Sequence, residues 1–520
     1  MRIRSNTLIS SLLLLFLSLS FASAEEREIR ILYLNDFHGF AEPYKPLGSK
    51  EMMGGIPYLA AKANALRKEK PSLLLAAGDM IQGNAWANLF QGESVIELMN
   101  TMHFDAMVVG NHEFDFGREV MKKRISEASF PLLGANVEGV ELLKPYVIKE
   151  LNGIRIGIIG LTTEDTPVST HPRNVYGLKF LPPAESIIKY LKELKDRADI
   201  VLVLSHIGYY SDRALAEQVK GIDVIVGGHS HTRVDTPTVV GKTIIVQAWE
   251  HGKVLGVLDL TLDNGKIAKV DGHLEEVKPE TGKEDREVIA VVQKYTQKVD
   301  EVLGERVGET EVDLDGENVR RTETNLGDLI ADIMRQVSGA DVAIVNGGDI
   351  RTSIKRGEIK VKDVYSVLPF NDYIVAIKLT GRELKEALEH GVSAREKEDG
   401  RFPQVSGLIF TYSPSAQIGS RVTEVIVSGK PLELDKEYSV ATNDFLAAGG
   451  DGYKAFGDAI KASHDFAVIG GMMKGGNLVY SDSGRWLKDV VIQYLKEKRT
   501  IAPKTEGRTR EIPCNENICQ

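Results

Sequence analysis

The sequence has little cysteine and few aromatic residues, and neither disordered nor fibrous composition fits it. Two of its 520 residues are cysteine and 7% are aromatic, whereas 42% are apolar and 27% are charged. This composition is that of a globular protein, and the length predicts two or more domains. The cysteines, Cys514 and Cys519, predict one disulfide if the protein is exported, and its small loop would constrain little. Free thiols are the alternative, and we assign the pair no function.

The sequence also lacks an excess of positive charge. Its formal net charge is −10, and the loss of Arg2 and Arg4 with a leader would make it −12. An acidic chain without a basic stripe is a poor partner for polymeric nucleic acid. Small anions remain possible ligands, held locally by metal ions and arginines.

Long apolar runs are absent except at the start of the chain. Arg2 and Arg4 precede an apolar run over residues 8–21, and small residues at 22–24 precede Glu25 and Glu26. This pattern predicts a secretory signal peptide over residues 1–24, and a mature protein in the periplasm or the medium without a membrane span. A retained membrane anchor is the alternative, but the run is short for a spanning helix and no cysteine follows to take a lipid.

Each of five apolar runs is followed directly by histidine, asparagine or acidic residues. The densest case is Gly110-Asn111-His112-Glu113-Phe114-Asp115, directly after the run 106–109. The others are Asp36-Phe37-His38 after 31–34, Gly78-Asp79 after 73–77, Ser205-His206 after 201–204 and Gly228-His229-Ser230-His231 after 224–226. Strand ends that carry such side chains form active-site edges in α/β proteins. A plain polar turn is the alternative for any one of these motifs.

Strand and helix patterns alternate over the first half of the chain. Residues 56–66 and 187–194 have helical spacing, and the continuous runs 154–161 and 200–204 are typical of strands buried on both faces. We therefore expect an α/β domain over residues 25–280, with strands inside and helices outside. Runs 243–249 and 254–262 are expected to form an antiparallel pair that closes it.

The second half has a core of its own. A helix with an apolar stripe over 288–302 is expected to link the domains as residues 281–304, although a surface helix of either domain is the alternative. A helix near 326–334, a strand over 341–345 and a helix over 484–496 place a second α/β (α+β) domain at 305–500. Residues 501–520 are expected to be a loose polar tail.

The five motifs together offer the donors of a metal centre. Carboxylates, imidazoles and an amide in this mixture suit a pair of borderline divalent ions, and the Asp79 carboxylate is able to bridge them. Two such ions can hold a phosphoryl group and generate a hydroxide near neutral pH. A hydrogen-bonded loop residue is the alternative for each histidine alone. However, five of the eleven histidines fall in these motifs.

In this order, the five motifs resemble those of the calcineurin-like metallophosphoesterases, and with the C-terminal motifs the chain resembles the 5′-nucleotidase family over residues 29–457. The resemblance implies an N-terminal β-sandwich flanked by helices, and two divalent ions, which would be Zn, Mn or Co. It implies metal ligands at Asp36, His38, Asp79, Asn111, His206, His229 and His231, of which His231 is the least secure. It also implies a catalytic pair, His112 and Asp115, in which the carboxylate orients the imidazole toward the transferring phosphoryl group.

Three C-terminal motifs imply nucleotide binding. Asn346-Gly347-Gly348-Asp349-Ile350-Arg351 offers close backbone approach and a guanidinium fork, while Pro369-Phe370-Asn371-Asp372 and Gly449-Gly450-Asp451-Gly452-Tyr453 each place an aromatic beside a turn. Taken alone, both aromatics would be core residues. The resemblance implies instead that they clamp the base, and it adds Arg320 as a substrate contact. Implied substrate-binding residues are Arg320, Asn346, Gly348, Arg351, Phe370, Asp372 and Tyr453. Some relatives have a further arginine where this chain has Gly316, which leaves the preferred nucleotide open.

The expected activity is hydrolysis of nucleoside 5′-phosphates by metal-activated water, with UDP-sugars and 2′,3′-cyclic nucleotides as further substrates of the family's exported bacterial members. The base and the phosphate would bind to different domains, so the domains must close, with a pivot at the helix over 288–302. One alternative is a related thiosulfohydrolase that acts on a sulfur chain bound to a carrier protein. Another is a relative that binds nucleotides without catalysis.

Overall fold

A computed structural model of the chain describes residues 26–46, 49–469 and 472–513. The predicted signal peptide and both cysteines lie outside the described residues. Within these ranges, every helix is too short or too polar to span a lipid bilayer.

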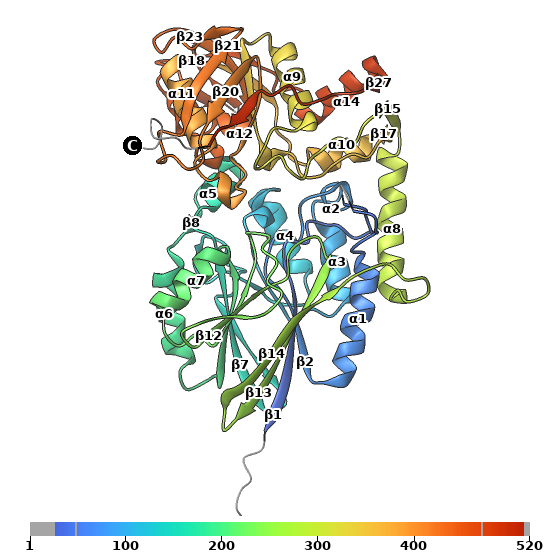
Figure 1. The fold of residues 1–520 in the computed structure, drawn as a ribbon. Helices are drawn as coiled ribbons and strands as arrows, with labels where there is room; N and C mark the ends of the chain where they lie inside the picture. The colour runs from blue at the N-terminus through green and yellow to red at the C-terminus, as the bar shows by residue number, and fades with distance from the viewer. Residues whose placement is uncertain (1–25, 47–48, 470–471, 514–520) are drawn as a thin grey trace, which may run out of the picture.

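Two six-stranded sheets face each other in the N-terminal half (Figure 1). The first sheet has the order β14 (Lys266–Glu276), β13 (Val254–Asp263), β1 (Arg27–Leu34), β2 (Ser72–Ala76), β3 (Ala106–Val108) and β4 (Leu132–Leu133). The second has the order β11 (Thr238–Val240), β12 (Thr243–Gln247), β10 (Val224–Gly227), β9 (Ile200–His206), β7 (Ile154–Thr162) and β6 (Tyr146–Leu151). Apolar side chains of both sheets, such as Ile31 and Ile158, form one buried core between them.

Helices cover the outer faces of this sandwich. On the first sheet lie α1 (Ile56–Glu69), α3 (Glu93–Thr101) and α4 (Arg118–Glu127), and on the second lie α6 (Pro183–Leu194) and α7 (Tyr209–Gln218). Strands β7 and β9 are buried along almost their whole length, because one face meets the other sheet and the opposite face meets helices. The predicted α/β class, with a helix-flanked sandwich, is confirmed.

The predicted pairing of runs 243–249 and 254–262 is wrong. Strand β12 pairs with β10 and β11 in the second sheet, whereas β13 pairs with β1 and β14 in the first. The short segment between the two runs therefore crosses from one sheet to the other. A hairpin and such a crossing have the same spacing of apolar runs and turn residues, so the sequence did not separate them.

Parallel pairing brings the polar strand ends to one edge of the sandwich. Strands β1, β2 and β3 are parallel neighbours, as are β9, β10 and β12. Because parallel strands all end on the same side, the residues that follow them meet above the two sheets.

The C-terminal half has four sheets of its own, of which the smallest is the pair β24 (Ala467–Ile469) and β25 (Met472–Lys474). The largest has the order β19 (Pro403–Ser406), β16 (Val342–Asn346), β23 (Glu437–Asn443), β18 (Ile374–Thr380) and β26 (Leu478–Ser481). The other two are β22 (Lys430–Pro431), β21 (Val422–Val427), β20 (Leu408–Tyr412) with β28 (Thr509–Glu511), and β17 (Gly357–Lys360), β15 (Arg306–Thr310) with β27 (Thr500–Ile501). Its helices are α9 (Asn325–Ser338), α10 (Val361–Val367), α11 (Gly381–Gly391), α12 (Asp444–Ala447), α13 (Lys454–Lys461) and α14 (Leu487–Lys498).

Helix α8 (Arg286–Leu303) runs along one side of the molecule from the N-terminal half to the C-terminal half (Figure 1). Its apolar stripe, including Val288, Val292 and Tyr295, is buried against α1 and α3. Near its far end, Asp300 accepts a hydrogen bond from Lys362 of α10 at 2.6 Å. The helix thus contacts both halves of the chain.

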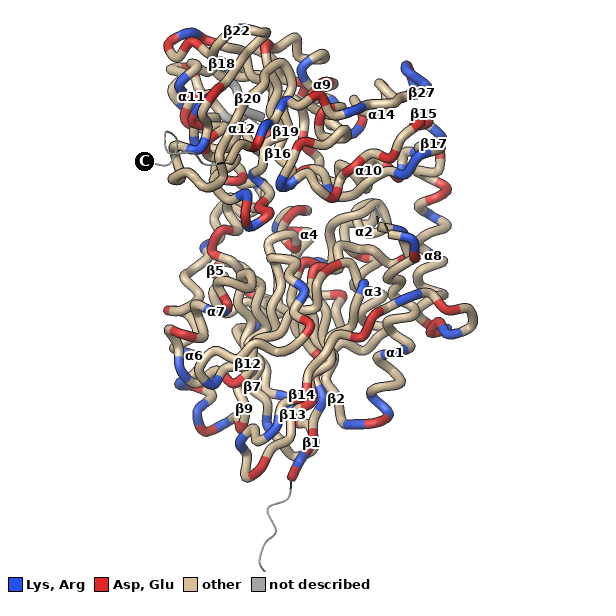
Figure 2. The backbone as a smooth tube through the Cα atoms, viewed as in Figure 1, with Lys and Arg blue, Asp and Glu red and all other residues tan. Residues whose placement is uncertain are grey.

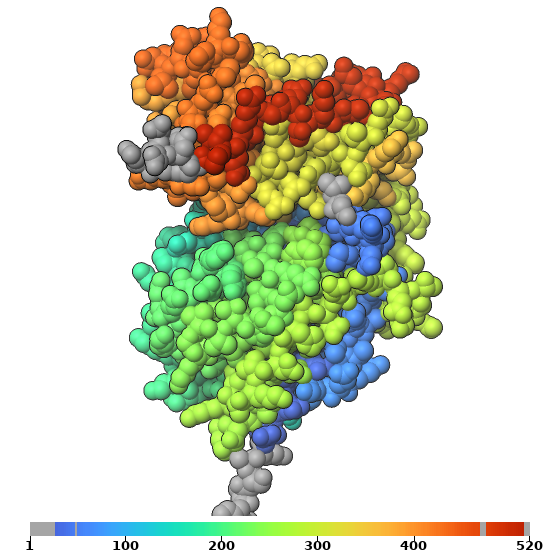
Figure 3. Space-filling model, viewed as in Figure 1, coloured from blue at the N-terminus to red at the C-terminus, as the bar shows by residue number. Residues whose placement is uncertain are grey.

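The C-terminal segment is not a loose tail where the structure describes it. Strands β27 and β28 each add to a sheet, and the segment crosses the surface of the C-terminal half (Figure 3). The carboxylate of Glu323 accepts the backbone N–H groups of Glu506, Gly507 and Thr509 at 2.6, 2.8 and 3.0 Å. These hydrogen bonds hold a polar sequence in place, which composition alone did not predict.

Charged residues of both signs are intermixed over the molecule (Figure 2). In that view, lysines and arginines lie among aspartates and glutamates on both halves. The mixture accords with the mildly acidic sequence pI of about 5.7.

Gly256 gives a test of the sandwich. It lies opposite Tyr33 in the β1/β13 pair, and a Cβ added there would lie 2.1–2.5 Å from three ring atoms of that fully buried tyrosine. Gly256→Ala should therefore destabilise the N-terminal half by about 1–3 kcal/mol, measured as a lower midpoint in calorimetry. Gly484→Ala is the control, because a Cβ there meets no heavy atom within 4 Å. Equal midpoints for the two variants would contradict this packing.

Candidate functional site

Two groups of metal-ligating side chains meet above the sheets. Asp36, His38 and His231 form one group, and Asp79, His206 and His229 form the other; within each group the ligand atoms lie within 4.8 Å of one another. Asn111 joins the second group, since its Oδ1 lies 3.0 Å from Nδ1 of His229. All seven predicted ligands are thus brought together.

Asp79 lies between the two groups. Its Oδ2 is 3.1 Å from Nε2 of His206 and 4.0 Å from Nε2 of His38. The residue is 2% exposed, so its carboxylate has almost no contact with solvent. A carboxylate that reaches both groups is the arrangement that a bridging metal ligand requires.

Backbone strain accompanies this site. Five of the predicted ligands have left-handed backbone conformations, with φ between 49° and 75°: Asp36, His38, Asp79, His229 and His231. Such conformations cost of order 1–3 kcal/mol each in residues other than glycine, and they concentrate at functional sites. They turn each side chain from its strand end toward the common centre.

Hydrogen bonds to protein oxygens orient three of the imidazoles. In each, Nδ1 lies against a protein oxygen and Nε2 faces the centre; the contacts are His38 to the carbonyl of Gln82 at 2.8 Å, His206 to that of Ala77 at 2.7 Å and His231 to Glu250 at 2.5 Å. This is how proteins fix the tautomer of metal-binding histidines.

The donors fit a pair of divalent ions. Nε2 of His206 is buried without a hydrogen-bond partner, and it points at the Asp79 carboxylate. With its Nδ1 donating to Ala77, a neutral His206 would turn a lone pair toward a carboxylate oxygen, an arrangement that a metal ion or a proton between them would stabilise. Burial disfavours the charged imidazole, but without an ion the Asp79 charge raises the pKa of His206 to about 10.

The Glu113 carboxylate connects two loops of the site, a role that the sequence motif did not predict. Its buried carboxylate accepts four backbone N–H groups, from Asp79, Met80, Ile81 and Gly110, at 2.6–3.2 Å. It thereby ties the loop after β2 to the loop after β3. Burial, followed by the Asp79 charge, raises the pKa of Glu113 to about 7.

The predicted catalytic pair is formed. Nδ1 of His112 lies 2.6 Å from Oδ2 of Asp115, and the hydroxyl of Thr170 donates to the other Asp115 oxygen. Nε2 of His112 is left to face the centre, 4.0 Å from Oδ2 of Asp79. Thr170 was missed, because it lies 55 residues along the chain in a segment without a recognisable motif.

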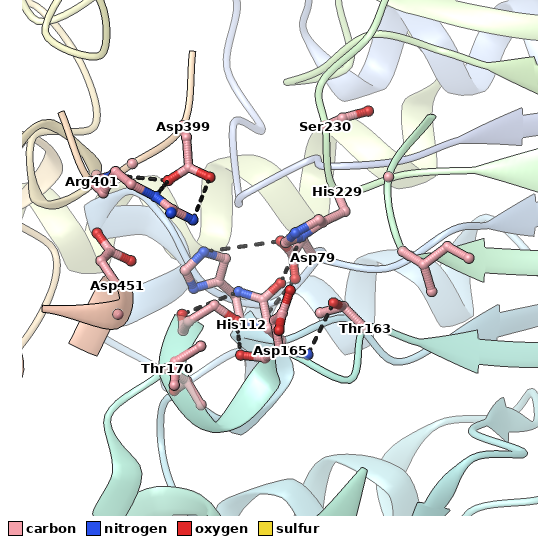
Figure 4. Close-up of a pocket in the computed structure, with 18 of the residues that line it drawn as sticks. Asp79, His112, Thr163, Asp165, Thr170, His229, Ser230, Asp399, Arg401 and Asp451 are labelled. Carbon is pink, nitrogen blue, oxygen red and sulfur yellow. Dashed lines mark hydrogen bonds and ion pairs between the residues drawn. The ribbon is translucent and has the colours of Figure 1, made fainter. Parts of the chain in front are cut away.

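A cavity of about 980 Å³ joins this centre to the C-terminal half. Figure 4 shows His112 with Asp79 on one side and the Asp399–Arg401 pair on the other. The predicted substrate residues that line the cavity are Arg320, Asn346, Gly348, Arg351, Phe370 and Asp372.

Two of these residues reach the N-terminal half directly. Nη2 of Arg351 lies 3.1 Å from Nε2 of His38, and the Phe370 ring stacks on His112 with centroids 5.8 Å apart. Burial and the charge of Arg320 lower the pKa of Arg351 to about 10. The Arg351 guanidinium thus contacts an imidazole rather than a carboxylate, and a phosphoryl group would supply it with an anion.

Tyr453 does not line the cavity, which corrects the expectation of two facing rings. It is 1% exposed, its ring stacks on Phe456 at 5.2 Å, and its hydroxyl donates to the Arg401 carbonyl at 2.6 Å. The preceding Asp451 has a positive φ of 50°, and the chain there turns the ring into the core of the C-terminal half. An aromatic beside a glycine turn can point either way, so the motif did not decide this.

Other cavity residues were not predicted from the sequence. Phe445 and the Asp399–Arg401 ion pair, with Nε to Oδ1 at 2.8 Å, line the side that belongs to the C-terminal half. Their surroundings carry no repeated motif, and only the fold brings them to the site.

At Gly316, where the family resemblance implies an arginine in some relatives, the backbone leaves no space for a side chain. A Cβ there would lie 2.1 Å from the carbonyl oxygen of Thr352. The absence of that cation is thus part of the local fold.

Comparisons with known proteins agree with this geometry. Residues 29–233 match the calcineurin-like phosphoesterases, and residues 306–458 match the 5′-nucleotidase C-terminal domain. Human 5′-nucleotidase is 31% identical over 562 residues, which cover 96% of this chain and 94% of the human protein. The chain belongs to the 5′-nucleotidase family. It is a phosphoric ester hydrolase, and calcineurin-like phosphoesterases use divalent metals.

Solved structures of other proteins show the same build. The 5′-nucleotidase precursor of Thermus thermophilus has a TM-score of 0.83 and 35% identity, covering 93% of this chain and 99% of that protein. A sulfate thiohydrolase of Thermus thermophilus in complex with glycerol has a TM-score of 0.78 but 22% identity, covering 94% and 97%. At that identity the likeness concerns the fold alone.

Metal removal tests the site of this 5′-nucleotidase family member. Chelator-treated protein should gain thermal stability on addition of Mn²⁺, Co²⁺ or Zn²⁺, since ions that bind only the folded state stabilise it. At 100 times the Kd we expect about 2.7 kcal/mol, or about 5–10 °C in midpoint for an N-terminal half of this size.

Asp79→Asn should lose most of this increment, because it weakens the ligand between the two groups. Asp235→Asn is the control, as that side chain is 66% exposed. An equal increment in all three proteins would contradict the assignment of the site.

Proposed function

We propose that this chain is a dimetal 5′-nucleotidase, which hydrolyses nucleoside 5′-phosphates to a nucleoside and phosphate. The observation that carries the proposal is Asp79, whose carboxylate reaches both groups of ligands beside His112. Family membership and the cavity between the two halves support it further.

The metal ions would be held by residues of the N-terminal half. One would take Asp36, His38 and His231, the other Asn111, His206 and His229, with Asp79 shared between them. When bound, such ions supply Lewis acidity toward a phosphoryl group and favour ionisation of water near neutral pH. Their identity in the cell, Zn, Mn or Co, remains part of the proposal.

His112 and Asp115 would act on the phosphoryl group. The contact of Nδ1 with Asp115, itself held by Thr170, fixes the ring so that Nε2 faces the cavity. Nε2 can then hold a proton for a phosphoryl oxygen or for the leaving 5′-oxygen. The described cavity residues include no serine or cysteine paired with a base, so we propose direct attack by water rather than a covalent intermediate.

Arg351 would bind the phosphate, with its planar guanidinium suited to two oxygens. Arg320, which lines the same cavity, would bind phosphate or ribose oxygens. These arginines belong to the C-terminal half, whereas the metal ligands belong to the N-terminal half. A nucleotide would therefore contact both halves at once, and we propose that they move about α8 to admit it.

The nucleobase would stack on Phe370, whose ring is exposed to the cavity. Asn346, Gly348 and Asp372 would bound this part of the cavity. We propose that Tyr453 acts indirectly, because its hydroxyl holds the backbone of Arg401.

Domain division and export are also proposals. We propose a metallophosphoesterase domain over residues 25–280, a linker over 281–304 and a nucleotide-binding domain over 305–500, and the separate sheets of the two halves support this division. A signal peptide over residues 1–24 would direct the protein to the periplasm or the medium. UDP-sugars and 2′,3′-cyclic nucleotides are proposed as further substrates.

A thiosulfohydrolase is the second candidate, supported by the fold of the Thermus thiohydrolase. Phe370 on the cavity wall favours a nucleobase over a sulfur chain. A relative that binds nucleotides without catalysis is disfavoured because both ligand groups are complete.

Phosphate release from AMP tests the proposal. The metal-loaded protein should hydrolyse AMP, and His112→Ala should lower kcat by about 100-fold or more while both ions stay bound. His273→Ala, at a histidine with a 52% exposed side chain, should leave kcat unchanged. If AMP, UDP-glucose and 2′,3′-cyclic AMP all remain intact with each metal, the proposed function is wrong.

Phe370→Ala tests the base contact. Loss of one stacking contact is worth about 1–3 kcal/mol, so KM for AMP should rise about 5- to 150-fold. KM for p-nitrophenyl phosphate, which carries no base, should change far less. Phe466→Ala, at a partly buried ring that does not line the cavity, is the control. Equal changes for both substrates would remove the base site.

A further inference from the structure

The turn between β12 and β13 contains a group that the ligand set does not explain. Glu250, with His231 and His251, forms a third cluster of metal-ligating side chains beside the first ligand group. Glu250 and His251 lie where the chain crosses from one sheet to the other, whereas His231 belongs to the loop after β10 and to the first ligand group. Such a cluster could bind a third ion, or it could position a residue of the proposed site.

Lys253 decides between these two possibilities. Its ammonium lies 2.5 Å from Oε1 of Glu250, and its side chain is buried with Nζ 4.2 Å from the centre of the Trp249 ring. A cation bound by Glu250 would lie against this fixed positive charge. His251 is also engaged, since its Nδ1 lies 2.9 Å from the Tyr44 hydroxyl and its ring stacks on Phe40 at 3.9 Å. Glu250 and His251 are therefore already bound to other protein groups, which favours a positioning role over a third ion.

The backbone of this turn fixes the direction of the Glu250 carboxylate. Trp249 and His251, on either side of it, have left-handed backbones with φ of 54° and 56°. The backbone N–H of His251 donates to the carbonyl of Asp36 at 2.8 Å, which ties the turn to the first ligand group. Strain of this kind persists where surrounding contacts impose it.

The Glu250 oxygen that does not contact Lys253 contacts His231 instead. Oε2 lies 2.5 Å from Nδ1 of His231, while Nε2 of the same ring lies 3.3 Å from both Oδ1 of Asp36 and Nε2 of His38. One nitrogen is thus held by Glu250, and the other faces the remaining ligands of the group. His231 was the least secure of the ligands predicted from the sequence, and this contact gives it a fixed orientation.

We infer that Glu250, itself fixed by Lys253, is a positioning residue that holds His231 with Nε2 toward one ion of the pair. The inference rests on the proposed dimetal site and deepens it. Carboxylates in this role usually change metal affinity about 10- to 100-fold when they are removed. The effect should fall on one ion of the two, because His206 of the other group is oriented separately, by the carbonyl of Ala77.

Metal titration of the purified protein tests this inference. The wild-type chain, titrated with Co²⁺ against a competing chelator, should bind two ions with a resolved visible spectrum. Glu250→Ala should weaken one of them about 10- to 100-fold and change the bands of that ion only. Glu250→Gln should lose less affinity, since its amide oxygen still accepts from Nδ1. Glu275→Ala is the matched control, because that carboxylate pairs with Lys62 and lies 37% exposed on β14.

A double variant distinguishes a loss of metal affinity from misfolding. Glu250→Ala leaves the Lys253 ammonium buried without its partner, whereas Glu250→Ala with Lys253→Met removes that charge and keeps the packing on Trp249. The double variant should fold and still show one weakened ion. Wild-type affinity for both ions in the double variant would overturn the inference alone. Fewer than two ions in the wild-type chain would overturn the proposed dimetal site, and the inference with it, and a third strongly bound ion would overturn the positioning role.

Discussion

Buried negative charge is the constraint on which the rest of this structure depends. The carboxylates of Asp36 and Asp79 are at most 2% exposed, and they face imidazole nitrogens. Removing a carboxylate from water without compensation costs several kcal/mol, and left-handed backbones add to that cost. A fold that bears both costs at one edge of the sandwich requires positive charge there, and the divalent metals that calcineurin-like phosphoesterases use would supply it.

The same constraint explains how the two halves meet. Arg351 of the C-terminal half places its guanidinium against His38, so part of the positive charge at the site comes from the other end of the chain. A second contact across the halves joins His171 to Asp444 at 3.1 Å, beside Arg173 at 3.5 Å. The cavity between them is consequently lined by metal ligands on one side and by arginines and an aromatic ring on the other. A phosphate ester with a flat substituent matches both sides.

The sequence predicted those parts of the site that follow directly from strands. Parallel neighbouring strands end on the same side of a sheet, so Asp79 and Asn111 of one sheet, and His206 and His229 of the other, could be expected to lie close together although they are far apart in the chain. The sequence did not predict what depends on how a turn is directed. The segment after β12 resembles a hairpin but crosses between sheets, and the ring of Tyr453 turns into the core rather than the cavity. The roles of Glu113 and Glu250 were not predicted for the same reason, since a glutamate near a turn gives no signal until the fold shows which groups its carboxylate contacts.

The central claim is that a pair of ions lies on either side of Asp79, and anomalous X-ray scattering tests it most directly. Crystals grown with Mn²⁺ and measured with anomalous signal should show two peaks. One should lie among Asp36, His38 and His231, and the other among Asn111, His206 and His229, with Asp79 between them. A single peak, or peaks away from these side chains, would contradict the account.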